Sequence, residues 1–266
     1  MRWIIGDIHG MLRPLEALVR GVQKKDPEAK FFFVGDYVNR GPDSKRVLDY
    51  LLTVKNAKFI RGNHDDIFDL ILHRQCFAIH PDVKGPGTAF KTFLEYGLDR
   101  TLSSYGITQS QIDKCLVHPG KEELEALLRP VPEAHRKFLR GLPAIIEEPD
   151  FFVVHAKWNI NEPTENPDLN TRLVLEPSYK HGVIWSRFSE EELHAKKPWE
   201  RTGYFGHTPV ANYERSTEEY LPVKGYKCVM LDTGVALSNS GRLTAFCHEN
   251  RRYIQSDRQG TLIEGH

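Results

Sequence analysis

The sequence has few cysteines and no excess of either charge. Its four cysteines, Cys76, Cys115, Cys228 and Cys247, are widely separated and form no C-x-x-C pair. This pattern predicts buried, reduced thiols and argues against a disulfide framework or a structural zinc knuckle. Lysine and arginine number 36, as do aspartate and glutamate. We therefore expect neither nucleic acid nor a membrane surface as a partner, and an anionic ligand must be attracted by local charges.

Long apolar runs are also missing. No stretch approaches the roughly 18 apolar residues of a membrane-spanning helix, and the first residues turn polar at Asp7. We therefore predict no signal peptide, no membrane span and a cytoplasmic protein. The 266 residues, 40% hydrophobic and 27% charged, are enough for one α/β domain with a substantial core. We predict a single domain over residues 1–266, and the oligomeric state stays open.

Alternating apolar runs and amphipathic segments open the chain. Residues 3–5, 31–34 and 58–60 predict short strands, and residues 12–22 and 42–52 predict helices between them. Continuous apolar strands alternating with helices indicate a covered parallel sheet. In such sheets ligands bind beyond the carboxyl ends of the strands. Each of these three strand ends carries Asp, His or Asn.

The rest of the chain divides less clearly. Residues from about 66 to 142 predict a mainly helical cap or insertion. A β-hairpin is predicted over 144–154, with His155 at its end. Residues 157–180 predict a loop. Its aromatic residues Trp158 and Tyr179 could line a substrate groove and stack on a nucleobase, but we expect them to anchor the loop by packing. Ser189 and the glutamates after it predict a capped helix start. Further short strands are predicted at 183–185, 204–205, 228–231 and 243–246.

Six side chains at the predicted strand ends are candidate metal ligands. They are Asp7, His9, Asp36, Asn63, His155 and His207. Singly, an Asp after a strand is commonly a helix cap or turn residue, and a His is commonly structural. Six together, mostly beside glycines that permit tight turns, favour a metal centre. Oxygen and nitrogen ligands without thiolate suit Mn, Fe or Zn better than Ca or Cu. Two such ions about 3.5–4 Å apart can clamp a phosphoryl group and activate a water.

Three segments resemble the PPP family of metallophosphatases, within the calcineurin-like phosphoesterase superfamily. These are residues 6–10 (GDIHG), 35–41 (GDYVNRG) and 62–65 (GNHD). Residues 154–156 (VHA), 185–187 (WSR), 206–209 (GHTP) and 232–234 (DTG) resemble its later motifs, in the right order. The resemblance implies an α/β sandwich of two mixed β-sheets flanked by helices, with the metals at the strand ends.

The resemblance also implies a role for each residue. Asp7, His9 and Asp36 would hold the first metal, with Asp36 bridging, and Asn63, His155 and His207 would complete the second. His64 matches the general acid that protonates the leaving oxygen. Arg40 and Arg187 match the arginines that grip the phosphoryl oxygens, and guanidinium groups suit phosphate. For Arg187 an ordinary exposed surface arginine is the alternative.

Two positions depart from the family pattern. Asn39 stands where the family's protein phosphatases usually carry Asp, so we expect a less basic His64, with Asn39 accepting a hydrogen bond through its side-chain oxygen. Asp65 replaces the usual Glu, which is similar to symmetrical diadenosine tetraphosphatases and some prokaryotic relatives.

The predicted function is metal-dependent hydrolysis of phosphomonoesters by a metal-activated water, with phosphoserine or phosphothreonine on proteins as the expected substrate. The metals are expected to be two divalent ions, Mn first, with Fe, Zn or Ni as alternatives. The nearest rival is hydrolysis of dinucleoside polyphosphates such as diadenosine tetraphosphate. A non-catalytic binding module on the same fold is disfavoured because all six ligand positions and His64 are present.

Overall fold

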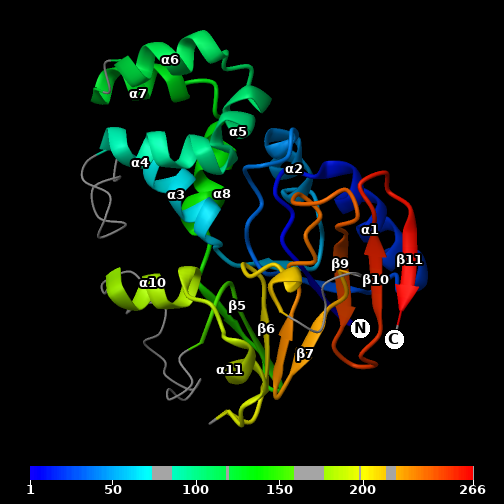
Figure 1. The fold of residues 1–266 in the computed structure, drawn as a ribbon. Helices are drawn as coiled ribbons and strands as arrows, with labels where there is room; N and C mark the ends of the chain where they lie inside the picture. The colour runs from blue at the N-terminus through cyan, green and yellow to red at the C-terminus, as the bar shows by residue number, and fades with distance from the viewer. Residues whose placement is uncertain (74–85, 118–119, 159–176, 198, 214–219, 266) are drawn as a thin grey trace.

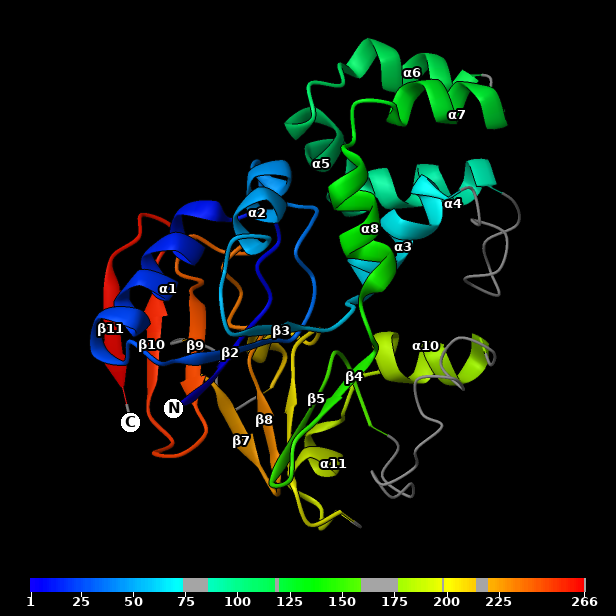
Figure 2. The same ribbon diagram turned by 180° about the vertical axis from the view of Figure 1, so that it is seen from behind.

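Two mixed β-sheets lie at the centre of the molecule, with helices on the outside (Figures 1 and 2). The computed structural model describes residues 1–73, 86–117, 120–158, 177–197, 199–213 and 220–265. This architecture confirms the predicted α/β fold.

The first sheet contains the strands that open the chain. Its order is β11-β10-β9-β1-β2-β3. The strands are β1 (Arg2–Ile5), β2 (Lys30–Phe33), β3 (Ala57–Phe59), β9 (Leu243–Cys247), β10 (Tyr253–Ser256) and β11 (Leu262–Gly265). β1, β2 and β3 are parallel, as predicted, and β9, β10 and β11 add antiparallel pairs. Helix α1 (Leu12–Lys25) packs against β9 and β10, and α2 (Ser44–Leu51) lies beside α1.

The second sheet has the order β4-β5-β6-β8-β7. Its strands are β4 (Ile145–Glu147), β5 (Phe151–Val154), β6 (Thr202–Phe205), β7 (Val223–Gly225) and β8 (Cys228–Met230). β4 and β5 form the predicted hairpin, and β5, β6 and β8 run parallel. The strand predicted at 183–185 is wrong, because these residues end helix α10 (Pro177–Trp185). A run of three apolar residues carries too little periodicity to separate a buried strand from a buried helix end.

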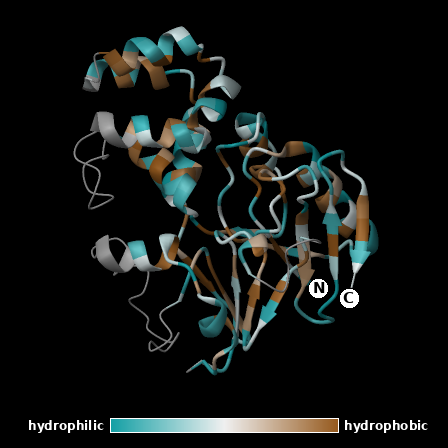
Figure 3. Cartoon of the chain, viewed as in Figure 1, coloured by the Kyte–Doolittle hydropathy of each residue, from teal (hydrophilic) through white to brown (hydrophobic). Residues whose placement is uncertain are grey.

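The core lies in layers on both sides of the sheets. Successive strand residues point to opposite faces, so Ile4 packs between the two sheets while Trp3 and Ile5 pack toward the helices. This explains the continuous apolar runs of the strands. Figure 3 shows hydrophobic segments along the strands of both sheets, whereas α11 (Glu190–His194), which begins at the predicted Ser189 cap, is mainly hydrophilic.

A helical segment connects β3 to β4. Its described elements are α3 (Asn63–Leu72), α4 (Pro86–Phe93), the π-helical turn η1 (Leu94–Leu98), α5 (Asp99–Ser104), α6 (Gln109–Val117), α7 (Lys121–Leu128) and α8 (Glu133–Gly141). Hydrogen bonds from Arg61, which follows β3, hold this segment at the end of the strand. Its guanidinium donates to Asp66 at 2.8 Å and Asp69 at 2.9 Å on α3, and to the Leu139 carbonyl at 2.8 Å on α8. The helices are thus fixed where the first sheet ends. The single-domain organisation stays a prediction.

Three of the four cysteines, Cys115, Cys228 and Cys247, are buried free thiols, as predicted. Cys76 and most of the loop predicted at 157–180 lie outside the described residues. The loop prediction is wrong for residues 177–180, which begin α10. Among the helices that the structure describes, none combines the length and apolar character needed to cross a membrane.

Candidate metal centre

The six candidate ligands meet where strands of the two sheets end. Asp7 and His9 follow β1, Asp36 follows β2, and Asn63 starts α3. From the second sheet, His155 follows β5 and His207 follows β6. All are buried except His207, which is half-buried. The structure therefore brings together side chains spread over two hundred positions of the sequence.

Tight backbone turns aim these side chains inward. His9, Asp36 and His207 have left-handed backbones, with φ of 47°, 56° and 60°. Such strain in non-glycine residues is uncommon and clusters at functional sites. Only glycine fits at two positions next to these ligands. A Cβ at Gly206 would overlap Oδ1 of Asp7, and a Cβ at Gly62 would overlap Oδ1 of Asp36.

Backbone carbonyls fix one nitrogen of each histidine ligand. Nδ1 of His9 lies 3.1 Å from the Val38 oxygen, and Nδ1 of His155 lies 2.7 Å from the Val34 oxygen. Nε2 of His207 lies 2.9 Å from the Trp185 oxygen. Since a carbonyl only accepts, each of these nitrogens carries the proton. In the neutral rings the opposite nitrogens present lone pairs, as metal-ligating histidines do. Burial opposes a second proton on His155, but the nearby Asp36 raises the pKa of His155 to about 9, so a metal ion would have to displace a proton from its Nε2.

Hydrogen-bond acceptors converge in the centre. Oδ1 of Asn63 lies 2.9 Å from Nε2 of His155 and 2.9 Å from Nδ1 of His207. If both nitrogens carry lone pairs, three acceptors face one another, and a cation is needed to make the arrangement favourable. Oδ1 of Asp7 and Nε2 of His9 are also buried and lack a hydrogen-bond partner among the described residues. The donor set therefore fits divalent metal ions.

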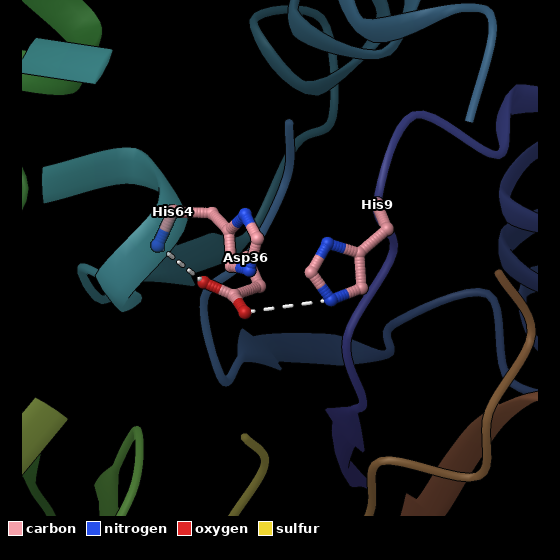
Figure 4. Close-up of side chains that lie close together, drawn as sticks. All are labelled: His9, Asp36 and His64. Carbon is pink, nitrogen blue, oxygen red and sulfur yellow. Dashed lines mark hydrogen bonds and ion pairs between the residues drawn. The ribbon is translucent and has the colours of Figure 1, made fainter. Parts of the chain in front are cut away.

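Asp36 stands between the two groups of histidines. Its Oδ2 lies 3.4 Å from Nε2 of His9 (Figure 4), and its Oδ1 lies 3.4 Å from Nε2 of His155. Burial alone would raise the pKa of Asp36, but the imidazoles of His155 and His64 hold it well below its usual range. A carboxylate that stays ionised and faces both groups suits a bridging ligand.

The donor atoms form two close clusters. In each, all ligand atoms lie within 4.8 Å of one another: His9, Asp36 and His64 in one, and Asp36, His155 and His207 in the other. Asp7 is in neither cluster, although its Oδ2 accepts a hydrogen bond from the His207 amide at 2.9 Å. Burial and the nearby Asp232 raise the pKa of Asp7 well above its usual value. A divalent ion would offset this effect by favouring the carboxylate.

Asn39 donates a hydrogen bond to His64, whereas we expected Asn39 to accept one. The Nδ2 of Asn39 lies 2.9 Å from Nδ1 of His64, so the amide donates. The Asn39 oxygen instead accepts from the Thr101 hydroxyl at 2.8 Å. His64 therefore carries its ring proton on Nε2, which lies 3.4 Å from Nη2 of Arg40. Burial lowers the pKa of His64 to about 4, against the opposing influence of Asp36.

The two predicted phosphate-binding arginines differ in setting. Arg40 is half-buried, and its Nη1 has no hydrogen-bond partner among the described residues. Arg187 is exposed just after α10. Burial and His155 lower the pKa of His207 to about 3, and Arg187 adds to this, which places its charge near the centre. Both arginines thus lie within electrostatic reach of the site, and their roles stay predictions.

The sequence reasoning noted Asp65 only as a departure from the family pattern and missed Thr101, and it predicted a supporting role for neither. The buried carboxylate of Asp65 accepts hydrogen bonds from the amides of Asp36 at 2.7 Å, Tyr37 at 2.9 Å and Gly62 at 3.0 Å. It thereby clamps the Asp36 turn to the start of α3. Its place in the GNHD segment was a usable signal. Thr101, by contrast, belongs to no motif and reaches the site only through the packing of α5.

Comparison with known proteins agrees with this geometry. The family model of the calcineurin-like phosphoesterases matches residues 2–186, and the chain belongs to this family. Two similar proteins are symmetrical bis(5′-nucleosyl)-tetraphosphatases. The one from Coxiella burnetii is 41% identical over 70 residues, which is 26% of this chain and 24% of the relative. The one from Pseudomonas syringae pv. tomato is 32% identical over 94 residues, 35% and 29% of the two chains. The matched region thus spans about a quarter of these relatives' length.

Two solved structures share the fold over nearly the whole chain. A candidate diadenosine tetraphosphatase has a TM-score of 0.53 and 22% identity, covering 99% of this chain and 92% of its own. A cold-active protein tyrosine phosphatase of a psychrophilic Shewanella species has a TM-score of 0.56 and 17% identity, covering 99% and 79%. At these identities the likeness shows the fold alone.

Proposed function

We propose that this chain hydrolyses phosphate esters or anhydrides with the help of two divalent metal ions. The convergence of ligand atoms from Asp36, Asn63, His155 and His207 carries the proposal, because these oxygen and nitrogen atoms lie close enough to share a cation. Asp7, His9 and Asp36 would hold one ion, and Asn63, His155 and His207 would hold the other, with Asp36 shared. When bound, the ions would supply Lewis acidity and lower the pKa of a water.

The protein residues would bind the substrate and move one proton. Arg40 and Arg187 would hold the phosphoryl oxygens through charge-assisted hydrogen bonds. Water attacks the phosphorus as the bond to the leaving oxygen breaks, and His64, after taking up a second ring proton, would protonate that oxygen through Nε2–H and return to its neutral form. By donating to Nδ1, Asn39 would keep the proton of the neutral ring on Nε2, and its amide would rotate when Nδ1 takes up a proton.

The named relatives favour dinucleoside polyphosphates as the substrate class. Both are called symmetrical bis(5′-nucleosyl)-tetraphosphatases, which supports a nucleotide anhydride over the phosphoserine or phosphothreonine that we expected from the sequence. Phosphomonoesters therefore become the rival class. Kinship with the PPP branch, manganese as the metal and a cytoplasmic location stay predictions from the sequence.

A substrate panel tests this proposal. We would offer an aryl phosphate, a phosphoserine peptide and diadenosine tetraphosphate, each with Mn, Fe, Zn or Ni. We expect metal-dependent turnover, with ADP as the nucleotide product from diadenosine tetraphosphate. His155→Ala should abolish turnover, whereas His194→Ala at the end of α11 should not. If no metal supports hydrolysis of any substrate, the proposal is wrong and the binding-module alternative returns.

A further inference from the structure

Four aromatic side chains form a continuous rim beside the metal centre. This aromatic rim consists of Phe93, Tyr96, His181 and Trp185. The Phe93 ring lies 5.7 Å from the Tyr96 ring and 5.9 Å from the Trp185 ring, between ring centres. The His181 and Trp185 rings are stacked, 6.2 Å apart with an interplanar angle of 10°. The rim thus joins the α4–η1 part of the helical segment to α10, and both lie on the same side of the molecule (Figures 1 and 2).

The rim contacts both halves of the centre. The Phe93 ring lies 6.0 Å from the ring of His64, the candidate acid. The Trp185 ring lies 6.3 Å from the ring of His207, and the Trp185 carbonyl accepts the hydrogen bond from that histidine. A molecule whose phosphate occupies the centre would therefore have aromatic faces next to it.

The backbone sets Tyr96 close to Arg40. Its neighbour Gly97 has φ of 91°, and the Gly97 carbonyl accepts a hydrogen bond from the Arg40 amide at 3.2 Å. A Cβ at Gly97 would overlap the Arg40 nitrogen, so the two backbones can approach this closely only because the residue is glycine. Tyr96 therefore directly precedes the residue whose backbone contacts the arginine that we expect to grip phosphate.

Tyr96 is also accessible. Its exposed fraction is 53%, whereas Phe93 behind it is 5% exposed. Among the described residues, the only other aromatic side chain of comparable exposure is Tyr226, at 44%, in the turn between β7 and β8. An exposed ring that rests on a buried ring offers a flat face at little cost in conformational freedom.

We propose that the aromatic rim, with Tyr96 as its outer face, is a stacking subsite for the nucleobase of a dinucleoside polyphosphate. The proposal rests on the proposed function and deepens it, since it assigns the part of the substrate that the metal centre does not hold. Bases stack on aromatic side chains whatever their identity. Arg40 would hold the phosphates, and the rim would hold the base that the phosphates carry. A phosphoserine side chain has no planar group to place there.

Binding measurements on the manganese-loaded protein test the subsite without turnover. We would compare the affinities of ADP and inorganic pyrophosphate, which shares the diphosphate but lacks the base. Tyr96→Leu should lower the ratio of ADP to pyrophosphate affinity by about 5- to 100-fold, the range expected for one stacked base. Tyr96→Phe should keep the ratio, because it keeps the ring. Tyr226→Leu, a matched exposed tyrosine, should also keep it.

Kinetics supply a second readout. Tyr96→Leu should raise KM for diadenosine tetraphosphate by a similar factor and leave kcat, and all turnover of an aryl phosphate, within about twofold of wild type. The inference is overturned if Tyr96→Leu leaves the affinity ratio where Tyr226→Leu leaves it, or if the wild-type protein does not prefer ADP to pyrophosphate. It is also overturned if only the KM for a phosphopeptide rises. A protein that hydrolyses no phosphoester defeats the proposed function, while the affinity ratio still decides the subsite.

Discussion

The orientation of His64 depends on one hydroxyl group from helix α5. The Thr101 hydroxyl donates to the Asn39 side-chain oxygen at 2.8 Å, which turns the amide nitrogen of Asn39 toward Nδ1 of His64 at 2.9 Å. Ser44 supports Thr101, with 2.9 Å between the two hydroxyl oxygens. Thr101→Val keeps the shape of the side chain and removes the hydroxyl. It therefore tests whether this relay sets the tautomer and the basicity of His64.

The size of the effect follows from burial. Asn39 and Thr101 are both fully buried, so the valine leaves the amide oxygen of Asn39 without a donor, at a cost of about 1–3 kcal/mol. Rotating the amide points its oxygen at His64 and its nitrogen at the valine. The rotated oxygen can accept from Nδ1–H and so favours the imidazolium form, which donates through Nε2–H. Since 1.4 kcal/mol is about a tenfold change in population, we expect the imidazolium fraction near neutral pH, and with it hydrolysis that needs the acid, to rise by about 10- to 100-fold.

A series of aryl phosphates separates this effect from general damage. With a nitrophenyl leaving group that departs unprotonated, Thr101→Val should change turnover by less than about twofold, while phenyl phosphate should show the full gain. Thr101→Ser retains the hydroxyl and should behave as wild type. Nitrogen-15 spectra of the imidazole should show the Nε2–H tautomer in wild type and the Nδ1–H tautomer in Thr101→Val. A loss of turnover, a change of equal size across all leaving groups, or an Nδ1–H tautomer in wild type would refute the reasoning.

Three further predictions concern single side chains. Asn39→Asp adds a negative charge that favours the imidazolium form of His64, so the alkaline limb of the activity profile should move to higher pH; profiles that overlay would contradict this. Asp65→Ala removes the acceptor of three backbone amides and should lower the free energy of unfolding in urea by more than about 3 kcal/mol, so a loss below about 1 kcal/mol would count against the clamp. Arg2 lowers the pKa of Asp150 to about 2. Because the shift is downward, its contribution is present above the unfolded pKa near about 4 and is lost as the pH falls toward 2. The stability difference between wild type and Arg2→Met should therefore be constant near neutrality and shrink over that acid range, whereas a difference independent of pH would exclude the ion pair as its source.

Much of the first sheet and the ligand positions could be predicted from the sequence. The strands β1 and β2 are buried on both faces over residues 3–5 and 31–33, so they appear as apolar runs that end abruptly in polar residues. β3, at the edge of the sheet, is only partly buried. Asp7, Asp36 and Asn63 follow those ends, and parallel strands bring their carboxyl ends to one edge. The glycines at 62 and 206 marked turns where another side chain approaches closely.

The missing elements lack such signals. Strands β7, β10 and β11 were not predicted, because they mix apolar and polar residues and β11 is largely exposed. The hydrogen bond between Asn39 and Thr101 depends on tertiary packing between segments far apart in the chain. The aromatic rim was missed for the same reason. Of the two aromatics considered for a substrate groove, Trp158 is fully buried against Phe152, as expected of a loop anchor, and the Tyr179 side chain lies outside the described residues.

The number of metal ions that the protein binds tests the central claim most directly. Protein stripped with a chelator would be titrated with Mn²⁺ and followed by calorimetry. We predict two equivalents for the wild type, fewer for Asp36→Ala because the shared ligand is lost, and two for the control His194→Ala. A wild-type protein that binds no ion, or binds the same number as Asp36→Ala, would contradict a two-metal centre at these strand ends.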